Sequence, residues 1–286
     1  MTPLWHGTLR KMRVQPDADG LATYALADGF WDPAARTPDH PLAVHLGREL
    51  HLEFTGRITC VYCGREGKKS FGEGFCYPCF QARAEADRCI VRPELCHYFD
   101  HADPCRDDAF ARSHCFQPHV LYVSLTSGLK VGITRRANLP TRWLDQGATA
   151  AVPLAELPDR RTVGLLEAHL RDEAGLADRT HWTRLLKFAE GEGDLPVHAD
   201  MVAALLQAHG VELLPDRERR VRRFRYPVLR YPEKVRSFNL DKEPCVGGVL
   251  QGIKGQYLIF ADGVVNLRKY TGYEATVTAG SAASDR

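Results

Sequence analysis

The sequence predicts an α+β protein made of several small modules, and three observations lead to this prediction. Eight of the nine cysteines fall between residues 59 and 118. From residue 119 onward, strand-like and helix-like apolar patterns follow one another. Short runs separated by glycine-rich turns, typical of strands, occupy both ends of the chain. At 286 residues the chain is long enough for two to three domains.

Residues 1–58 are predicted to form a β-rich N-terminal segment. WHGTLRKMRV and LAVHLGRELHLEFTGRI alternate loosely, and ADG and TPDHP mark turns between them. No secretory segment is visible at the N-terminus, and no apolar run approaches the roughly 20 residues of a membrane span. We therefore expect a cytoplasmic protein that does not associate with a membrane. In that compartment, cysteines are better explained by metal binding than by disulfides.

Residues 59–118 are predicted to form a cysteine-rich zinc-binding module. This block has no long periodic apolar segment, so it cannot bury much apolar surface and needs another source of stability, such as a bound metal ion. It begins with CVYC, followed by twelve residues and CYPC. Two such pairs can supply the four thiolates of a tetrahedral site, and no surrounding pattern favours a redox role. A structural zinc ion is predicted on Cys60, Cys63, Cys76 and Cys79.

A second group of cysteines follows at irregular spacing. It consists of Cys89, Cys96, Cys105 and Cys115, with several histidines nearby. A second zinc ion with these four ligands is one interpretation. The other is that some of them are buried thiols. Cys245 stands alone and is predicted to be a core residue.

Residues 119–214 are predicted to form an ordinary domain of strands and helices. HVLYVSL and LKVGIT read as two strands joined by a Thr-Ser-Gly turn. NLPTRWLDQG begins a helix, VPLAELP is extended, and RTVGLLEAHLRDEAG has the apolar stripe of an amphipathic helix. Further helices are expected at 180–189 and 199–209.

Residues 215–279 are predicted to hold a basic arm and a small β-barrel or sheet, and residues 280–286 a disordered tail. The net charge is only +2, but six arginines fall between residues 217 and 225, with aromatic residues among them. Arginine with aromatic side chains suits phosphate contact and base stacking. A solvated surface with local acidic partners is the alternative. The predicted nucleic-acid contacts here are Arg219, Arg220, Arg222, Arg223, Arg225 and Lys254.

Blocks along nearly the whole chain, among them CVYC, CYPCF, CIVRPELCHYF, DRTHW and GVVNLRKYTGY, resemble the DUF2797 family of bacterial proteins. That resemblance implies no particular activity. Residues 119 to about 175 also resemble the GIY-YIG nuclease superfamily. The resemblance implies two hairpin strands with the GIY and YIG motifs, then a helix with an arginine, then a helix with a metal-binding glutamate.

The GIY-YIG resemblance assigns roles to four residues. Tyr122 in LYV matches the tyrosine of GIY, and Lys130 in KVG replaces the tyrosine of YIG, as in relatives with a KIG motif. Arg142 in TRW matches the helix arginine, and Glu167 in GLLEAHL the glutamate. The first glycine of GIY is absent. Gln146 stands one turn after Arg142, where active members often carry His or Tyr.

These four side chains suit phosphodiester hydrolysis. The tyrosine can relay a proton from water, and the lysine and arginine can hold the scissile phosphate. The glutamate can hold one Mg²⁺ or Mn²⁺ ion near the leaving oxygen. Arg135 and Arg136 are further predicted phosphate contacts. Each residue also has an ordinary interpretation, as a core aromatic, a solvated cation or an ion pair along the helix.

The sequence thus favours a zinc-stabilised, divalent-metal-dependent nuclease acting on DNA or RNA. Two alternatives stay open. One is a nucleic-acid-binding protein that uses the same fold as a scaffold without catalysis. The other is a zinc-organised protein-interaction module whose arginines meet an acidic partner. Salt dependence of binding separates nucleic-acid contact from the last alternative.

Overall fold

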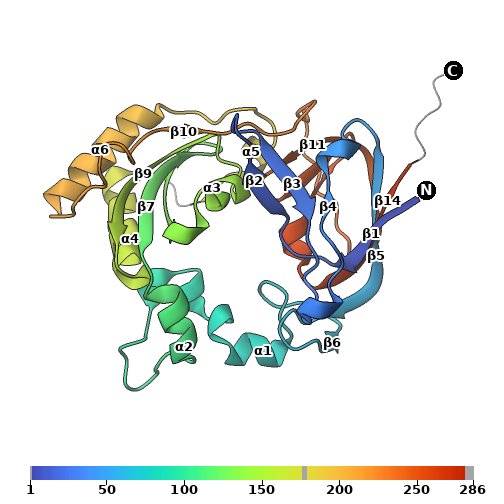
Figure 1. Cartoon of the computed structure of the whole chain (residues 1–286), viewed down its shortest axis with the longest axis horizontal. Helices are drawn as coiled ribbons and strands as arrows, with labels where there is room; N and C mark the ends of the chain where they lie inside the picture. Colours follow the sequence, from blue (N-terminus) through green and yellow to red (C-terminus); the bar gives the residue numbers. More distant parts are fainter. Residues whose placement is uncertain (1, 176–178, 281–286) are drawn as a thin grey trace. The chain divides into compact units, whose positions relative to one another are not determined.

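Strands from the two ends of the chain pair in one sheet, as the blue and red ribbons of Figure 1 show. The computed structural model describes residues 2–175 and 179–280. The chain divides into two units: unit 1 comprises residues 1–81 and 225–286, and unit 2 comprises residues 82–224. The predicted segments 1–58, 59–118, 119–214 and 215–279 therefore do not coincide with these units, because strand pairing joins distant parts of the sequence.

Unit 1 is built on an antiparallel sheet with the strand order β1-β14-β5-β11-β12-β13, and β6 pairs with β5 outside this path. A smaller sheet has the order β2-β3-β4. The strands are β1 Thr2–Thr8, β2 Arg13–Pro16, β3 Ala22–Leu26, β4 His40–Pro41, β5 Glu49–Thr59, β6 Glu66–Gly67, β11 Cys245–Lys254, β12 Tyr257–Phe260, β13 Val264–Asn266 and β14 Tyr273–Ala279. The one α-helix of this region in the described residues, α1, spans Tyr77–Ala82.

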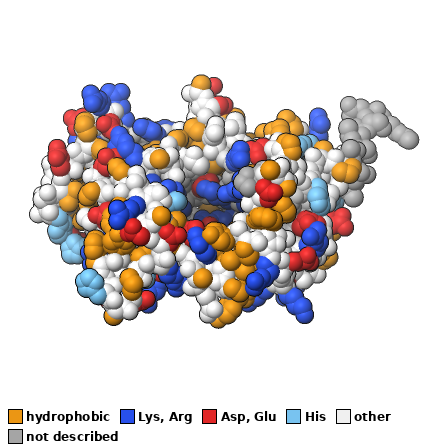
Figure 2. Space-filling view, turned by 60° about the horizontal axis from the view of Figure 1, so that its bottom comes forward, with side chains coloured by type: hydrophobic (Ala, Val, Ile, Leu, Met, Phe, Trp, Pro, Cys, Tyr) orange, Lys and Arg blue, Asp and Glu red, His pale blue; other side chains and the backbone are white. Residues whose placement is uncertain are grey.

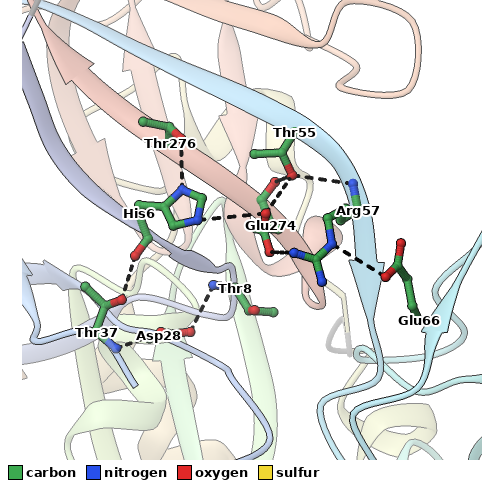
Figure 3. A network of polar contacts seen from close by, with 9 residues as sticks. All are labelled: His6, Thr8, Asp28, Thr37, Thr55, Arg57, Glu66, Glu274 and Thr276. Atoms are coloured by element: carbon green, nitrogen blue, oxygen red, sulfur yellow. Dashed lines mark hydrogen bonds and ion pairs between the residues drawn. The ribbon is translucent and has the colours of Figure 1, made fainter. Parts of the chain in front are cut away.

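A polar network joins the neighbouring strands β1, β14, β5 and β6 of unit 1 (Figure 3). The Arg57 guanidinium on β5 lies 3.1 Å from the Glu274 carboxylate on β14 and 3.5 Å from that of Glu66 on β6. The buried Asp28 accepts hydrogen bonds from the backbone N–H groups of Thr8 and Thr37, at 2.9 and 2.8 Å. These contacts hold β6, and with it the start of the first cysteine cluster, against the sheet.

Unit 2 is built on an antiparallel sheet with the strand order β10-β9-β7-β8. The strands are β7 His119–Leu125, β8 Leu129–Arg135, β9 Ala150–Leu157 and β10 Arg222–Arg223. The helices are α2 Asp108–Phe110, α3 Thr141–Asp145, α4 Arg160–Ala174, α5 Trp182–Leu185 and α6 Leu195–Ala208. Helices α4 and α6 pack on the sheet through a core that includes Leu121, Val123, Val163, Leu170 and Val202.

Helix α4 has clear local signals at both ends. The Asp159 carboxylate accepts a hydrogen bond of 2.8 Å from the backbone N–H of Thr162, which caps the first turn. Gly175 ends the helix with φ of +61°, a conformation that glycine adopts without a steric penalty. The predicted helix at 161–175 is confirmed, and so are the two strands of the hairpin at 119–134.

The mixed α+β class predicted from the sequence is confirmed, with antiparallel pairing in the described sheets. The basic stretch after residue 216 forms no helix and contributes the two-residue strand β10. In the predicted disordered tail, residues 281–286 lie outside the described residues. Among the helices of the described residues, none has the length and apolarity needed to cross a membrane.

Candidate functional site

The first cysteine cluster lies in unit 1, on the turn between β5 and β6 and at the start of α1. The sulfur atoms of the four predicted ligands all lie within 4.8 Å of one another. The Cys63 and Cys76 sulfur atoms are 3.7 Å apart. Tetrahedral zinc with Zn–S bonds of about 2.3 Å spaces its sulfur ligands by about 3.8 Å. The cluster of Cys60, Cys63, Cys76 and Cys79 can therefore hold a structural zinc ion.

The backbone around this cluster has the form that two CxxC turns require. The Gly64 N–H donates to the Cys60 carbonyl at 3.0 Å, and Gly64 has φ of +72°. Burial acts to raise the pKa of Cys60, but backbone N–H groups directed at its sulfur, from Cys63, Cys76 and Tyr62, outweigh it and lower the pKa to about 7. Donors directed at a sulfur atom stabilise the thiolate form that a metal ion needs.

The second cysteine group lies in unit 2, in short turns that precede β7. All four side chains line one small cavity. Within the described part of the chain, however, the four sulfur atoms do not lie within 4.8 Å of one another as those of the first cluster do. The atoms that meet this limit belong instead to Asp87, Cys89 and His97. Burial raises the pKa of Cys89 to about 12, and the charge of Asp87 acts in the same direction.

The hairpin β7–β8 places Tyr122 directly opposite Gly132. Tyr122 is fully buried, and its hydroxyl donates a hydrogen bond of 3.0 Å to the Gln146 side-chain oxygen. A Cβ atom at Gly132 would lie 2.8 Å from the tyrosine hydroxyl oxygen, so the glycine makes room for the ring. Burial raises the pKa of Tyr122; the Arg142 charge lowers it, and the Glu167 carboxylate raises it. Tyr122 therefore keeps its proton at neutral pH.

Glu167 lies on α4 among four cations. Burial raises the pKa of Glu167 to about 7. The charges that act against this rise come, largest first, from Lys130, Arg142, Arg160 and Arg171. The charges of Lys130 and Arg142 thus act on Glu167, and those of Arg142 and Glu167 act on Tyr122. Lys130 is itself 5% exposed on β8.

Sequence reasoning missed Arg160 as a member of this group. Its guanidinium donates to the Ile90 carbonyl, while its Nε atom is buried with no hydrogen-bond partner among the described residues. Burial lowers the pKa of Arg160. The signal was available, since Arg160, Gly164, Glu167 and Arg171 share one side of a helix with 3.6 residues per turn. Gln146, noted in the sequence only as a departure, is the partner of the buried tyrosine.

Some of the predicted nucleic-acid contacts of unit 2 form ion pairs with neighbouring acidic side chains. Arg136 bonds to Glu156 at 2.6 Å and also pairs with Glu218. Arg219 pairs with Asp216 and donates to the Leu214 carbonyl at 2.9 Å. These two side chains have the local acidic partners of a solvated surface.

The remaining predicted contacts of unit 2 are Arg135, which is half-buried, and Arg220, Arg222 and Arg223, which are exposed. Arg222 lies over the Trp143 ring, 5.6 Å from its centroid. On the face shown in Figure 2, basic side chains are interspersed with acidic and hydrophobic ones. The exposed arginines on and beside β10 therefore fit a phosphate-contacting role better than the paired ones.

In unit 1, Arg225 is exposed and Lys254 is not. The Lys254 side chain is fully buried, with its ammonium 5.5 Å from the Tyr226 ring centroid and 5.3 Å from that of Tyr231. The sequence assigned Lys254 to a surface; the structure places it between two aromatic rings, where an ammonium is attracted by the ring faces. The prediction of a core position for Cys245 is also wrong, because this residue is exposed on β11.

Comparison with known proteins gives one relation. No curated protein and no solved structure matches the chain. A family model described as "Protein of unknown function (DUF2797)" matches residues 47–275, which include both cysteine groups, the hairpin β7–β8 and helix α4. The chain therefore belongs to the DUF2797 family.

Proposed function

We propose that unit 2 is a divalent-metal-dependent phosphodiesterase that acts on DNA or RNA, on a GIY-YIG-like fold. The observation that carries the proposal is Glu167, a half-buried carboxylate on which the charges of Lys130 and Arg142 act and whose own charge acts on Tyr122. The order of elements supports it as well, since a hairpin with the tyrosine and lysine precedes α3 with the arginine and α4 with the glutamate.

The residues present fit a hard divalent cation. Mg²⁺ and Mn²⁺ prefer oxygen ligands, and Mg²⁺ often uses one or two carboxylates together with substrate phosphates and water. Glu167 supplies such a carboxylate. A bound ion here would stabilise charge on the phosphoryl group and the leaving oxygen.

The other side chains have separate tasks. Lys130 and Arg142 bind the non-bridging phosphate oxygens, where charge grows as a water oxygen attacks phosphorus and the bond to the leaving oxygen breaks. The Tyr122 hydroxyl donates a hydrogen bond to the Gln146 side-chain oxygen. The lone pairs of its oxygen are then left to accept a hydrogen bond from the attacking water, which makes Tyr122 a group that orients water rather than a strong base.

An alternative function is nucleic-acid binding without hydrolysis, favoured by the exposed Arg222 stacked on Trp143. Binding of this kind weakens steeply with salt because arginine side chains displace counterions from phosphates. Binding to mixed-sequence DNA and RNA at 50 and 200 mM salt tests it. Affinity that is absent, or unchanged between the two conditions, contradicts both functions and favours a protein-interaction module.

Nicking of supercoiled plasmid and cleavage of labelled RNA with Mg²⁺ or Mn²⁺ test hydrolysis. The wild type is compared with Glu167→Gln and with Asp172→Asn, a control at an exposed acid of the same helix. We expect cleavage by the wild type and the control and loss in Glu167→Gln. Binding without cleavage in all three supports the alternative, and equal cleavage in all three contradicts the role of Glu167.

A further inference from the structure

The cavity of the second cysteine group is large enough for one ion. It lies in unit 2 between the turns Arg88–Ile90 and Pro93–Leu95 and the helical turn Ala111–Cys115. Its volume is about 20 Å³, and about 10–15 Å³ suffices for a single water molecule. Cysteine side chains line the cavity from several of these turns, so one ion at its centre can contact several sulfur atoms.

His97 is oriented in a way that is common among metal ligands. Its Nδ1 atom lies 2.5 Å from the Asp103 carbonyl oxygen. Because a carbonyl only accepts, Nδ1 carries a proton and donates it in a hydrogen bond, as the second ring N–H of zinc-bound histidines usually does. The Nε2 atom faces the Asp87 carboxylate at 3.3 Å, so a metal ion at Nε2 replaces any proton held there. The Cys89 sulfur lies within 4.8 Å of a ring nitrogen of His97.

Asp87 lines the cavity, but other groups already engage its carboxylate. Its carboxylate accepts from the Cys89 backbone N–H at 3.2 Å and lies 3.2 Å from the Arg106 Nε atom. Its other close neighbour is His97 Nε2, at 3.3 Å. An acid with these partners orients the ligands and needs no metal bond of its own.

Positive charge beside the cavity is a second, independent observation. The Arg160 guanidinium donates to the carbonyl of Ile90, which lines the cavity, and its buried Nε atom has no hydrogen-bond partner among the described residues. A buried cation is costly unless negative charge compensates it. Neutral thiols supply none, whereas three metal-bound thiolates and one imidazole around Zn²⁺ carry a net charge of −1.

We propose that this cavity is a second structural zinc site, with the thiolates of Cys89, Cys96 and Cys115 and the Nε2 atom of His97 as ligands. Cys96 and Cys115 line the same cavity as Cys89 and His97. Cys105 directs its sulfur toward the Asp107 carbonyl oxygen, at 3.7 Å, and stays outside the ligand set. Soft sulfur with one imidazole favours zinc over Mg²⁺ or Ca²⁺. Binding draws the sulfur atoms closer together than they now lie.

The site fixes helix α4 in unit 2. The turn Pro93–Leu95 packs so closely on the helix that a Cβ atom at Gly164 would lie 2.4 Å from the Pro93 Cβ. Arg160 bonds to the carbonyl of Ile90 in the neighbouring turn. The zinc-bound turns therefore hold the face of α4 that carries Glu167. This role does not depend on hydrolysis, and it holds equally for a protein that only binds nucleic acid.

Zinc content tests the proposal independently of any activity. Full-length protein purified without added metal is expected to contain two zinc ions per chain, one in each site. His97→Gln and Cys115→Ser should retain one. Cys245→Ser, at an exposed cysteine outside both groups, and Cys105→Ser should retain two. One zinc in the folded wild type overturns the second site. Loss in Cys105→Ser with retention in His97→Gln overturns the ligand assignment.

If the variants do not fold, X-ray absorption at the zinc edge of the wild type tests the proposed ligands instead. The proposed ligands, averaged with those of the first site, predict about 3.5 sulfur and 0.5 nitrogen atoms per zinc. An average of four sulfur atoms contradicts a histidine ligand.

Discussion

Glu167→Gln should make unit 2 more stable at alkaline pH while removing its proposed metal ligand. The folded protein holds the pKa of Glu167 at about 7, against an ordinary value of 4.5. Between these values the folded state binds more protons than the unfolded state, so stability falls as pH rises, and the cost is fully present above pH 7. At about 1.4 kcal/mol per pKa unit, the carboxylate costs about 3 kcal/mol at pH 8 and about 1 kcal/mol at pH 5.5. Glutamine carries no charge and removes this cost.

Urea unfolding in Mg²⁺-free buffer, followed by tryptophan fluorescence, to which the buried Trp143 contributes, measures the difference. We expect Glu167→Gln to exceed the wild type in stability by up to about 3 kcal/mol at pH 8, and by less at pH 5.5. Asp172→Asn, at an exposed acid on the same helix, should show no such trend. Added Mg²⁺ should stabilise the wild type and leave Glu167→Gln unchanged. A variant no more stable than the wild type at pH 8, or one whose advantage grows toward acid pH, refutes the reasoning.

Two further predictions concern the hairpin and the basic surface. Gly132→Ala should displace the Tyr122 ring, destabilise the protein by about 1–3 kcal/mol and abolish cleavage. Gly128→Ala, where the nearest atom to a new Cβ is 3.9 Å away, should have none of these effects. Equal effects of the two variants in denaturation and cleavage assays would contradict the packing argument. Arg222→Ala should reduce the slope of log affinity against log salt by about one. Arg136→Ala should change this slope less, because Glu156 and Glu218 already engage that side chain. Fluorescence anisotropy titrations on DNA and RNA measure both slopes, and equal changes would contradict a role for this surface.

Local signals were sufficient for the elements that carry the candidate site. The hairpin at 119–134 alternates around a turn, and α4 has an apolar stripe, an Asp cap and a terminal glycine, so its boundaries were predictable to within a residue. The first cysteine cluster was predictable for the same reason, because two CxxC turns fix four sulfur atoms over a short length of chain.

The remainder depends on contacts between distant parts of the sequence. Pairing of β1 with β14 joins the two chain ends into one sheet, and no local pattern indicates a partner about 270 residues away. Lys254 was predicted to extend the basic surface, yet two tyrosine rings from the preceding arm lie against its ammonium. The helix spacing places Arg160 beside Glu167, but no local pattern indicates its bond to the Ile90 carbonyl, 70 residues away.

The rate of metal-dependent cleavage under single-turnover conditions tests the central claim most directly. Wild type and Glu167→Gln are compared at pH 8 with Mn²⁺ or Mg²⁺ on labelled DNA and RNA, after both are shown to be folded and to contain equal zinc. The account predicts cleavage by the wild type that is at least about 100-fold faster than by the variant, as expected when a metal ligand is lost. Rates that agree within about twofold, or no cleavage by the wild type on either substrate, would contradict it.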